Sequence, residues 1–188
     1  MPHSPNDIIV NVMKILAISG SLRALSSNTA LLRVAAEVAP EGVIVTMYDG
    51  LATLPQFNPD DDVDAPPPSV LALRAQVGEA DGLLLCSPEY AHGVPGSLKN
   101  AFDWLVRSLE FPFKPVALLN ASPWAMHAHA SLIETLGVMN ARIVSEACAT
   151  IPVGRADVGP SGEITNDEIR EATRQAVERF VGEIGEKR

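Results

Sequence analysis

The stretch that decides the fold runs from Lys14 to Thr29 and reads KILAISGSLRALSSNT. Its first five residues form an apolar run rich in strand-forming side chains. A run of that length, bounded by turn residues, is typical of a strand buried on both faces. A loop of serines with one glycine, one arginine and one asparagine follows, and a helical pattern comes after it. Helix N-terminal N–H groups, hydroxyls and a guanidinium favour an anion, so this order predicts a phosphate site.

The loop matches neither of two common nucleotide-binding motifs. No G-K-[ST] closes it, and G-x-G-x-x-G is absent, so the sequence has neither a Walker A motif nor a dinucleotide fingerprint here. Hydroxyl groups suit a terminal monophosphate, which has three oxygens to satisfy, better than a bridging pyrophosphate. A serine-rich connection that only caps the next helix is the alternative, and composition alone leaves both interpretations open.

The overall composition is that of an ordinary globular chain. The 188 residues are 47% hydrophobic and 20% charged, enough for one α/β domain with a full core. We expect a loose extension over residues 1–12 and a single domain over residues 13–188. The net charge of -9 and the lack of a basic stripe argue against a nucleic-acid partner. No segment resembles a membrane span or a signal peptide, and Cys86 and Cys148 lie in apolar runs, so we predict a cytoplasmic protein with free thiols.

Short apolar runs alternate with helical patterns along the whole chain. This alternation predicts an α/β fold in which a five-stranded parallel sheet is covered by helices on both faces. With the strand order 2-1-3-4-5, the loops after the first, third and fourth strands meet at one edge, where such sheets bind ligands. The expected strands are 14–18, 43–48, 83–86, 116–119 and one that starts at 141, and the expected helices are 28–39, 69–78, 96–109, 125–136 and one that opens at 165.

The three loops together suit one kind of ligand. The first offers phosphate donors, the second offers Pro88, Glu89 and Tyr90, and the third offers Ser122 and Trp124 with nearby polar groups. A phosphate socket, a planar stacking surface and amide partners for ring heteroatoms are what flavin mononucleotide (FMN) needs. The residues permit this ligand without requiring it.

Two other groups of residues raise the question of a metal. The aspartates at 60, 61, 62 and 64 resemble a calcium loop only faintly, because Ala65 replaces the turn glycine and Leu71 the bidentate glutamate. A solvated acidic loop is the better interpretation. His127 and His129 are two residues apart and do not share a helix face, and no carboxylate or cysteine next to them completes a site. We therefore predict no metal.

Two segments carry a resemblance to a known family. Gly20–Asn28 is similar to the G-S-x-R-x-x-S-x-N phosphate loop of the NAD(P)H-dependent FMN reductases, which include quinone, chromate and azo reductases. Ser87–Trp104 resembles the family's second signature, P-E-Y-x-x-x-x-P-G-x-L-K-N-A-I-D-W. The resemblance extends over about residues 13–185 and is weaker in detail after residue 120. It implies a flavodoxin-like three-layer sandwich.

The resemblance also assigns residues to FMN. It implies that the phosphate is held by Ser21, Arg23, Ser26, Asn28 and Thr29, and that Pro88, Glu89 and Tyr90 line the ribityl chain and the ring edge. Ser122 of the third loop joins them as a candidate. That loop departs from the family's pattern, because its glycines are missing and Trp124 is added.

The implied activity is hydride transfer from NADPH or NADH, by way of FMN, to a quinone-like, flavin or other small acceptor. The chemistry then lies on the flavin, with His92 as a candidate proton donor to a reduced quinone. A flavodoxin-type electron carrier and a flavin-free binding module are the alternatives. The resemblance further implies a homodimer or homotetramer, which we expect to form through the exposed face of the helix at 98–109, with Trp104 buried in the contact.

Overall fold

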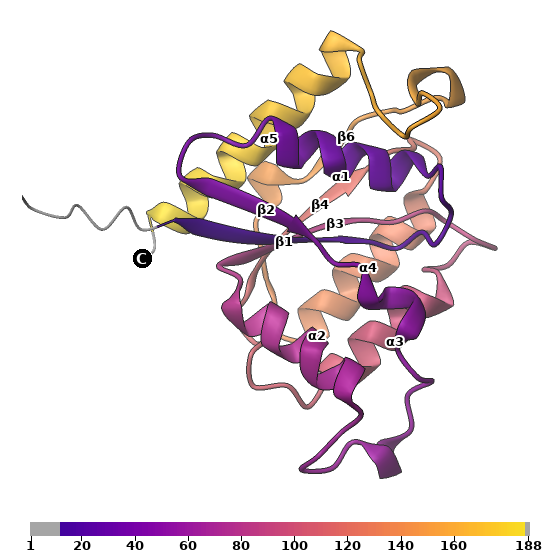
Figure 1. Cartoon of the computed structure of the whole chain (residues 1–188), viewed down its shortest axis with the longest axis vertical. Helices are drawn as coiled ribbons and strands as arrows, with labels where there is room; N and C mark the ends of the chain where they lie inside the picture. Colours follow the sequence, from indigo (N-terminus) through magenta and orange to yellow (C-terminus); the bar gives the residue numbers. More distant parts are fainter. Residues whose placement is uncertain (1–11, 187–188) are drawn as a thin grey trace, which may run out of the picture.

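Five parallel strands form the body of the sheet, in the order β2-β1-β3-β4-β5 (Figure 1). The structure, a computed structural model, describes residues 12–186, so the predicted extension lies outside the described residues except for Val12. The order confirms the predicted flavodoxin-like topology. The strands are β1 (Met13–Ser19), β2 (Val43–Met47), β3 (Gly82–Cys86), β4 (Pro115–Asn120) and β5 (Arg142–Ile143).

The edge strand beside β4 is interrupted, which the sequence did not predict. β5 pairs with the start of β4, and a short β6 (Ala149–Thr150) pairs with its end. The 3₁₀ turn η3 (Ser145–Ala147) lies between them. The segment after β6 stays beside β4, because the Val153 N–H donates to the carbonyl of Ala121 at 2.9 Å. The interruption carries the chain to the carboxyl edge of the sheet, where the loops gather.

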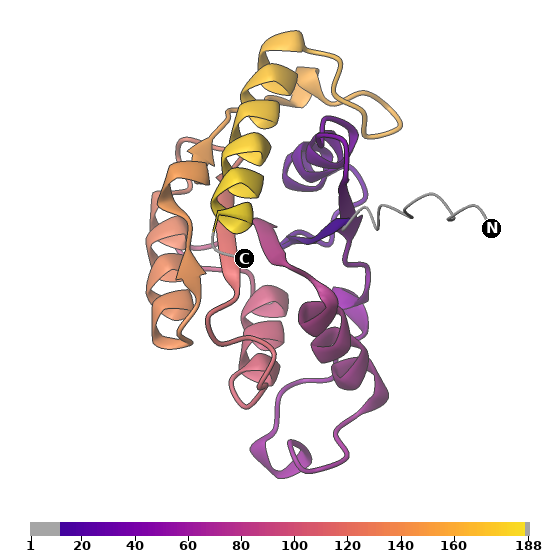
Figure 2. The same ribbon diagram turned by 90° about the vertical axis from the view of Figure 1, so that its left-hand side faces the viewer.

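Helices cover both faces of the sheet, as predicted. Figure 1 shows α1 and α5 together on one side of the sheet and α2 and α3 on the other. Helix α4 lies on the same side as α2 and α3 (Figure 2). Strand β1 serves both layers: Ile15 and Ala17 pack with α1 and α5, whereas Leu16 and Ile18 pack against α2 and α3. This explains why the stretch Ile15–Ile18 is apolar at every position. The helices are α1 (Ser27–Glu37), α2 (Pro68–Glu79), α3 (Gly96–Leu105), α4 (Met126–Val138) and α5 (Asp167–Gly185).

Helix α3 ends at Leu105, one turn earlier than the predicted helix over 96–109. Val106 and Leu109, which the helical pattern placed on the buried face, are therefore exposed. Trp104 is fully buried within one chain, and its indole N–H donates to the carbonyl of Pro55 at 2.8 Å. The expectation that Trp104 is buried in a contact between subunits is wrong, because its own chain already covers it.

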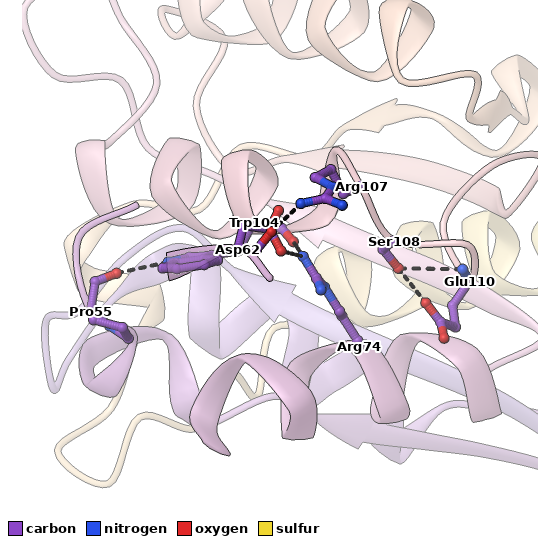
Figure 3. Close-up of polar contacts among 7 residues, drawn as sticks. All are labelled: Pro55, Asp62, Arg74, Trp104, Arg107, Ser108 and Glu110. Atoms are coloured by element: carbon purple, nitrogen blue, oxygen red, sulfur yellow. Dashed lines mark hydrogen bonds and ion pairs between the residues drawn. The ribbon is translucent and has the colours of Figure 1, made fainter. Parts of the chain in front are cut away.

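The connection between β2 and α2, which carries the aspartates at 60, 61, 62 and 64, is not a solvated loop throughout. It contains the short 3₁₀ turns η1 (Gly50–Thr53) and η2 (Pro59–Asp61), and Asp62, directly after η2, is 1% exposed. One carboxylate oxygen of Asp62 pairs with Arg74 at 2.8 Å, while Arg107 donates to the Asp62 carbonyl (Figure 3). Arg74 also donates twice to the Trp104 carbonyl. Asp62 therefore anchors the loop to α2 and to the end of α3, whereas Asp60, Asp61 and Asp64 are exposed as predicted.

Both cysteines of the chain are free thiols, as predicted. Cys86 is buried and Cys148 is half-buried. Among residues 12–186, no helix combines the length and the apolar character needed to cross a membrane.

Candidate functional site

A cavity of about 390 Å³ opens at the carboxyl ends of β1, β3 and β4, where the three polar loops meet. Its volume lies within the range of about 300–1,000 Å³ that is typical of small-molecule sites. The edge is the one at which parallel sheets of this order bind ligands. The lining residues are Ser21, Arg23, Ser26, Ser27, Asn28, Pro88, Glu89, Tyr90, Ala121, Ser122, Trp124, Ala125 and Val153.

The first loop is held in shape by its own hydroxyl groups. The N–H of Ser21 donates to Ser19 Oγ at 3.2 Å, and the N–H of Arg23 donates to Ser21 Oγ at 3.3 Å. Ser26 is the N-cap of α1, and its Oγ accepts from the N–H of Thr29 at 3.4 Å. The loop therefore ends in a capped helix whose N-terminal N–H groups lie beside the cavity.

Gly20 allows the first and second loops to approach each other closely. Its N–H donates to the carbonyl of Cys86 at 2.9 Å. A Cβ at this position would lie 2.5 Å from Ser87 Oγ and 3.0 Å from a side-chain carbon of Leu98. Any larger residue would push the two loops apart, so the glycine sets the width of the cavity at this corner.

The electrostatics at this corner favour an anion. Arg23 is exposed, and within residues 12–186 its side chain has no ion-pair partner. The first turn of α1 contains no acidic residue, so nothing there offsets the positive end of the helix dipole. Although the chain carries a net charge of -9, this corner is locally positive.

Asn28 and Thr29 occupy different positions relative to the cavity. Asn28 lines it, and its Oδ1 accepts from the thiol of Cys86 at 3.2 Å. Thr29 does not line it, because its hydroxyl bonds to Ser19 Oγ at 2.8 Å. Burial raises the pKa of Cys86 to about 12, so the thiol stays neutral near pH 7 and serves as a hydrogen-bond donor rather than a nucleophile.

The second loop is a hairpin tied to the third loop. The N–H and C=O groups of Tyr90 and Gly93 bond to each other, and Ala91 and His92 between them have φ of 49° and 59°. These are the positive φ angles of a type I′ turn, which glycine and asparagine usually adopt. A carboxylate oxygen of Glu89 accepts from the N–H of Ala128 in the first turn of α4 at 2.9 Å. The hairpin and α4 thus hold each other in place.

The third loop gives one wall of the cavity. Asn120 Oδ1 accepts from the N–H of Ser122 at 3.1 Å, and Ser122 Oγ accepts from the N–H of Trp124 at 3.3 Å. These bonds shape the loop without glycines. Trp124 lines the cavity with its side chain 86% exposed, so its ring is available to a ligand.

Most of the predicted site residues meet at one cavity. Seven of the eight predicted FMN contacts from the first two loops line it, as does Ser122; Thr29 does not. His92 also lies outside the lining residues and stacks on His127 instead. Sequence reasoning missed Val153, which reaches the cavity only because the chain follows β4 after β6, and no local pattern marks it.

Comparisons with known proteins identify the family of this chain. A family model described as NADPH-dependent FMN reductase matches residues 13–155. An NAD(P)H-dependent FMN reductase of Pseudomonas aeruginosa is 34% identical over 171 residues, which cover 88% of this chain and 92% of that protein. A quinone reductase of Escherichia coli is 35% identical over 113 residues, which cover 58% of this chain and 60% of that protein.

A solved structure has the same fold over almost its whole length. The flavoenzyme NAD(P)H:(acceptor) oxidoreductase FerB from Paracoccus denitrificans is 29% identical with a TM-score of 0.81, and the match covers 93% of this chain and 98% of that one. The family model spans both loop signatures and the sheet between them. The chain therefore belongs to the NADPH-dependent FMN reductase family.

Proposed function

We propose that this chain is an FMN-dependent NAD(P)H oxidoreductase that reduces a quinone-like, flavin or other small acceptor. The observation that carries the proposal is the cavity itself, at which the predicted phosphate loop meets the second family signature. Membership of the family supports the same conclusion independently of the geometry.

The residues present fit FMN. The phosphate needs hydrogen-bond donors and positive charge, which the N-terminus of α1, the hydroxyls of Ser21 and Ser26 and the guanidinium of Arg23 supply. The ring needs a flat surface and polar partners along its edge. Tyr90 and Trp124 are exposed aromatic residues that line the same cavity. The volume of about 390 Å³ admits a ligand of this class.

In this scheme the residues of the chain bind and orient FMN. FMN, when bound, supplies the ability to take a hydride from NADH or NADPH and to hand two electrons to an acceptor. Arg23 and the capped N-terminus of α1 would hold the phosphate, and the Glu89–Ala128 hydrogen bond fixes the hairpin that presents Tyr90 to the cavity. His92 stacks on His127 and does not line the cavity, so we assign it no proton-transfer role.

A direct experiment tests the proposal. Purified protein is first examined for a flavin absorption spectrum, with and without added FMN, and NADPH and NADH oxidation are then followed with a soluble benzoquinone. We expect FMN to bind with about one equivalent per chain and turnover to require protein, FMN and quinone together. A protein that takes up no FMN and shows no turnover refutes the proposal and supports a flavin-free binding module.

Photoreduction of the FMN-loaded protein, together with the turnover measurement, separates the electron-carrier alternative. A flavodoxin-type carrier would bind FMN, oxidise NADPH very slowly and accumulate a stable one-electron-reduced flavin on photoreduction. We expect rapid turnover and no such accumulation.

We also propose a homodimer or homotetramer, because Val106 and Leu109 leave apolar side chains exposed beside α3. Light scattering after size exclusion measures that state directly.

A further inference from the structure

We propose that Glu89, His92 and His127 form a binding site for one divalent transition-metal ion, with Zn²⁺ as the best-fitting ion. Each residue offers one ligand atom, and these atoms all lie within 4.8 Å of one another. The site shares Glu89 with the cavity, while His92 and His127 lie outside the cavity lining. This inference goes beyond the proposed function and does not depend on it.

The donor set selects the kind of ion. Two imidazoles and one carboxylate are a ligand set found in zinc sites that keep a fourth position for water. Imidazole nitrogen suits Zn²⁺, Cu²⁺ and Ni²⁺, whereas Mg²⁺ and Ca²⁺ prefer oxygen ligands throughout. Cu²⁺ binds most nitrogen and oxygen sites more tightly than Zn²⁺ does, so it serves as a second probe of the same residues.

The carboxylate is already oriented for this role. One Glu89 oxygen accepts from the N–H of Ala128 at 2.9 Å, which leaves the other oxygen available to a metal. Ligating carboxylates in metal sites are commonly fixed by such a second hydrogen bond. Among the titratable residues of the cavity, Glu89 is therefore the one whose position is set by a neighbouring backbone group.

The two imidazoles can close around an ion. In a tetrahedral site with Zn–N and Zn–O bonds of about 2.0–2.1 Å, neighbouring ligand atoms are about 3.4 Å apart. His92 and His127 are exposed, and their rings stack with centroids 4.2 Å apart and an interplanar angle of 22°. Rotation of these exposed side chains, with no movement of the core, brings their nitrogens toward the free Glu89 oxygen.

The backbone conformation that brings the three ligands together is strained at His92. His92 has a φ of 59° in the hairpin, a conformation that is strained for a residue with a Cβ. Asparagine or glycine would adopt it more easily. The hairpin delivers His92 onto the first turn of α4, where His127 lies one residue before Ala128, the partner of Glu89. Two segments that are distant in the sequence thus place three ligands at one point.

The chain supplies its own controls for a binding experiment. His3 and His129 are its other histidines, and His129, on α4, is not part of the cluster. Tag-free, full-length protein loaded with FMN is stripped of metal by dialysis against a chelator. Zn²⁺ is then titrated in competition with a chromophoric chelator, for the wild type and for His92→Asn, His127→Asn, His3→Asn and His129→Asn.

We expect one Zn²⁺ per wild-type chain. His92→Asn and His127→Asn should each weaken binding at least tenfold, whereas His3→Asn and His129→Asn should change it less than twofold. Asparagine tolerates the backbone of residue 92, so the first variant is expected to fold. A circular dichroism spectrum and a melting curve check that both cluster variants remain folded.

A second readout identifies the ligands directly. Substoichiometric Cu²⁺ should broaden the imidazole NMR signals of His92 and His127 more strongly than that of His129, because only the first two would be bonded to the ion. The proposal is overturned if His92→Asn and His127→Asn each bind Zn²⁺ as tightly as the wild type, or if Cu²⁺ broadens all histidine signals equally. Repeating the titration without FMN separates this proposal from the proposed function, because the metal site is expected in both forms.

Discussion

Replacing Arg23 by alanine tests whether the first loop is a phosphate site. The guanidinium lines the cavity, is exposed and has no ion-pair partner within residues 12–186, so the change removes positive charge without orphaning a buried carboxylate. We expect the Arg23→Ala protein to fold normally and to bind FMN more weakly.

The magnitude follows from the position of the side chain. A hydrogen bond to a charged group contributes about 1.5–3 kcal/mol, and the exposure of Arg23 places it toward the lower end of that range. The N-terminus of α1 and the serine hydroxyls remain in the variant. A loss of about 1.5–2 kcal/mol corresponds to a Kd for FMN that is roughly 10- to 30-fold higher.

Fluorescence titration of FMN and riboflavin makes the test specific. Riboflavin lacks the phosphate, so its affinity should change less than twofold in Arg23→Ala. Arg33→Ala is the matched control, because Arg33 is also exposed on the same segment but does not line the cavity. The difference between wild type and Arg23→Ala should shrink at high salt. If riboflavin binding falls as much as FMN binding, or if FMN binding falls less than threefold, the phosphate assignment of this loop is refuted.

Three further predictions concern other parts of the molecule. Asp62→Ala should lower the free energy of unfolding in urea by about 3 kcal/mol, because it leaves the Arg74 guanidinium, whose side chain is only 14% exposed, without its carboxylate, and Asp64→Ala should change it by less than about 0.5 kcal/mol; equal effects would contradict the role of Asp62 as an anchor. Burial raises the pKa of Cys86 to about 12, so the thiol in the folded state loses its proton at a higher pH than in the unfolded state. The contribution of this thiol to the free energy of unfolding is therefore fully present below about pH 9 and falls by about 1.4 kcal/mol per pH unit above it. Urea unfolding between pH 8 and 10 should show a steeper loss for the wild type than for Cys86→Ala, and parallel losses would count against this cause. Trp124→Ala should raise KM for a benzoquinone about two- to tenfold through lost aromatic contact and change kcat less than twofold, as steady-state kinetics will show; an unchanged KM would place the acceptor elsewhere.

Local pattern was sufficient for the sheet and for the first two loops. The run at the start of β1 is apolar because both of its faces are buried, and that signal is legible in five residues. The loops after β1 and β3 carry dense motifs, and parallel topology brings the ends of these strands to one edge. The sequence therefore predicts Ser21, Arg23 and Glu89 at one edge of the sheet, and in the structure all three line the same cavity.

Helical periodicity predicted the wrong end for α3, because tertiary contacts determine where that helix stops. The pattern after Leu105 continues as a helix in the sequence, yet Arg107 leaves it to bond to the backbone of Asp62, and Leu109 becomes exposed. Asp62 looks like its exposed neighbours in the sequence, because nothing local distinguishes an aspartate that meets Arg74 from one that meets water. Burial of a single charge depends on a partner 12 residues away in the chain.

The sequence by itself determined the layered α/β architecture and the family, because strand runs, helix stripes and loop motifs are encoded within short windows, and the expected strand order came with the family resemblance. Only the tertiary structure placed His92 against His127 and Glu89, and only it brought Val153 to the cavity. His92 and His127 are 35 residues apart, and Val153 is 32 residues from Ala121, to which it bonds; these contacts depend on a hairpin angle, a helix start and an interrupted edge strand. No spacing pattern in the sequence predicts these contacts, because they result from the packing of helices, strands and loops that are far apart in the chain.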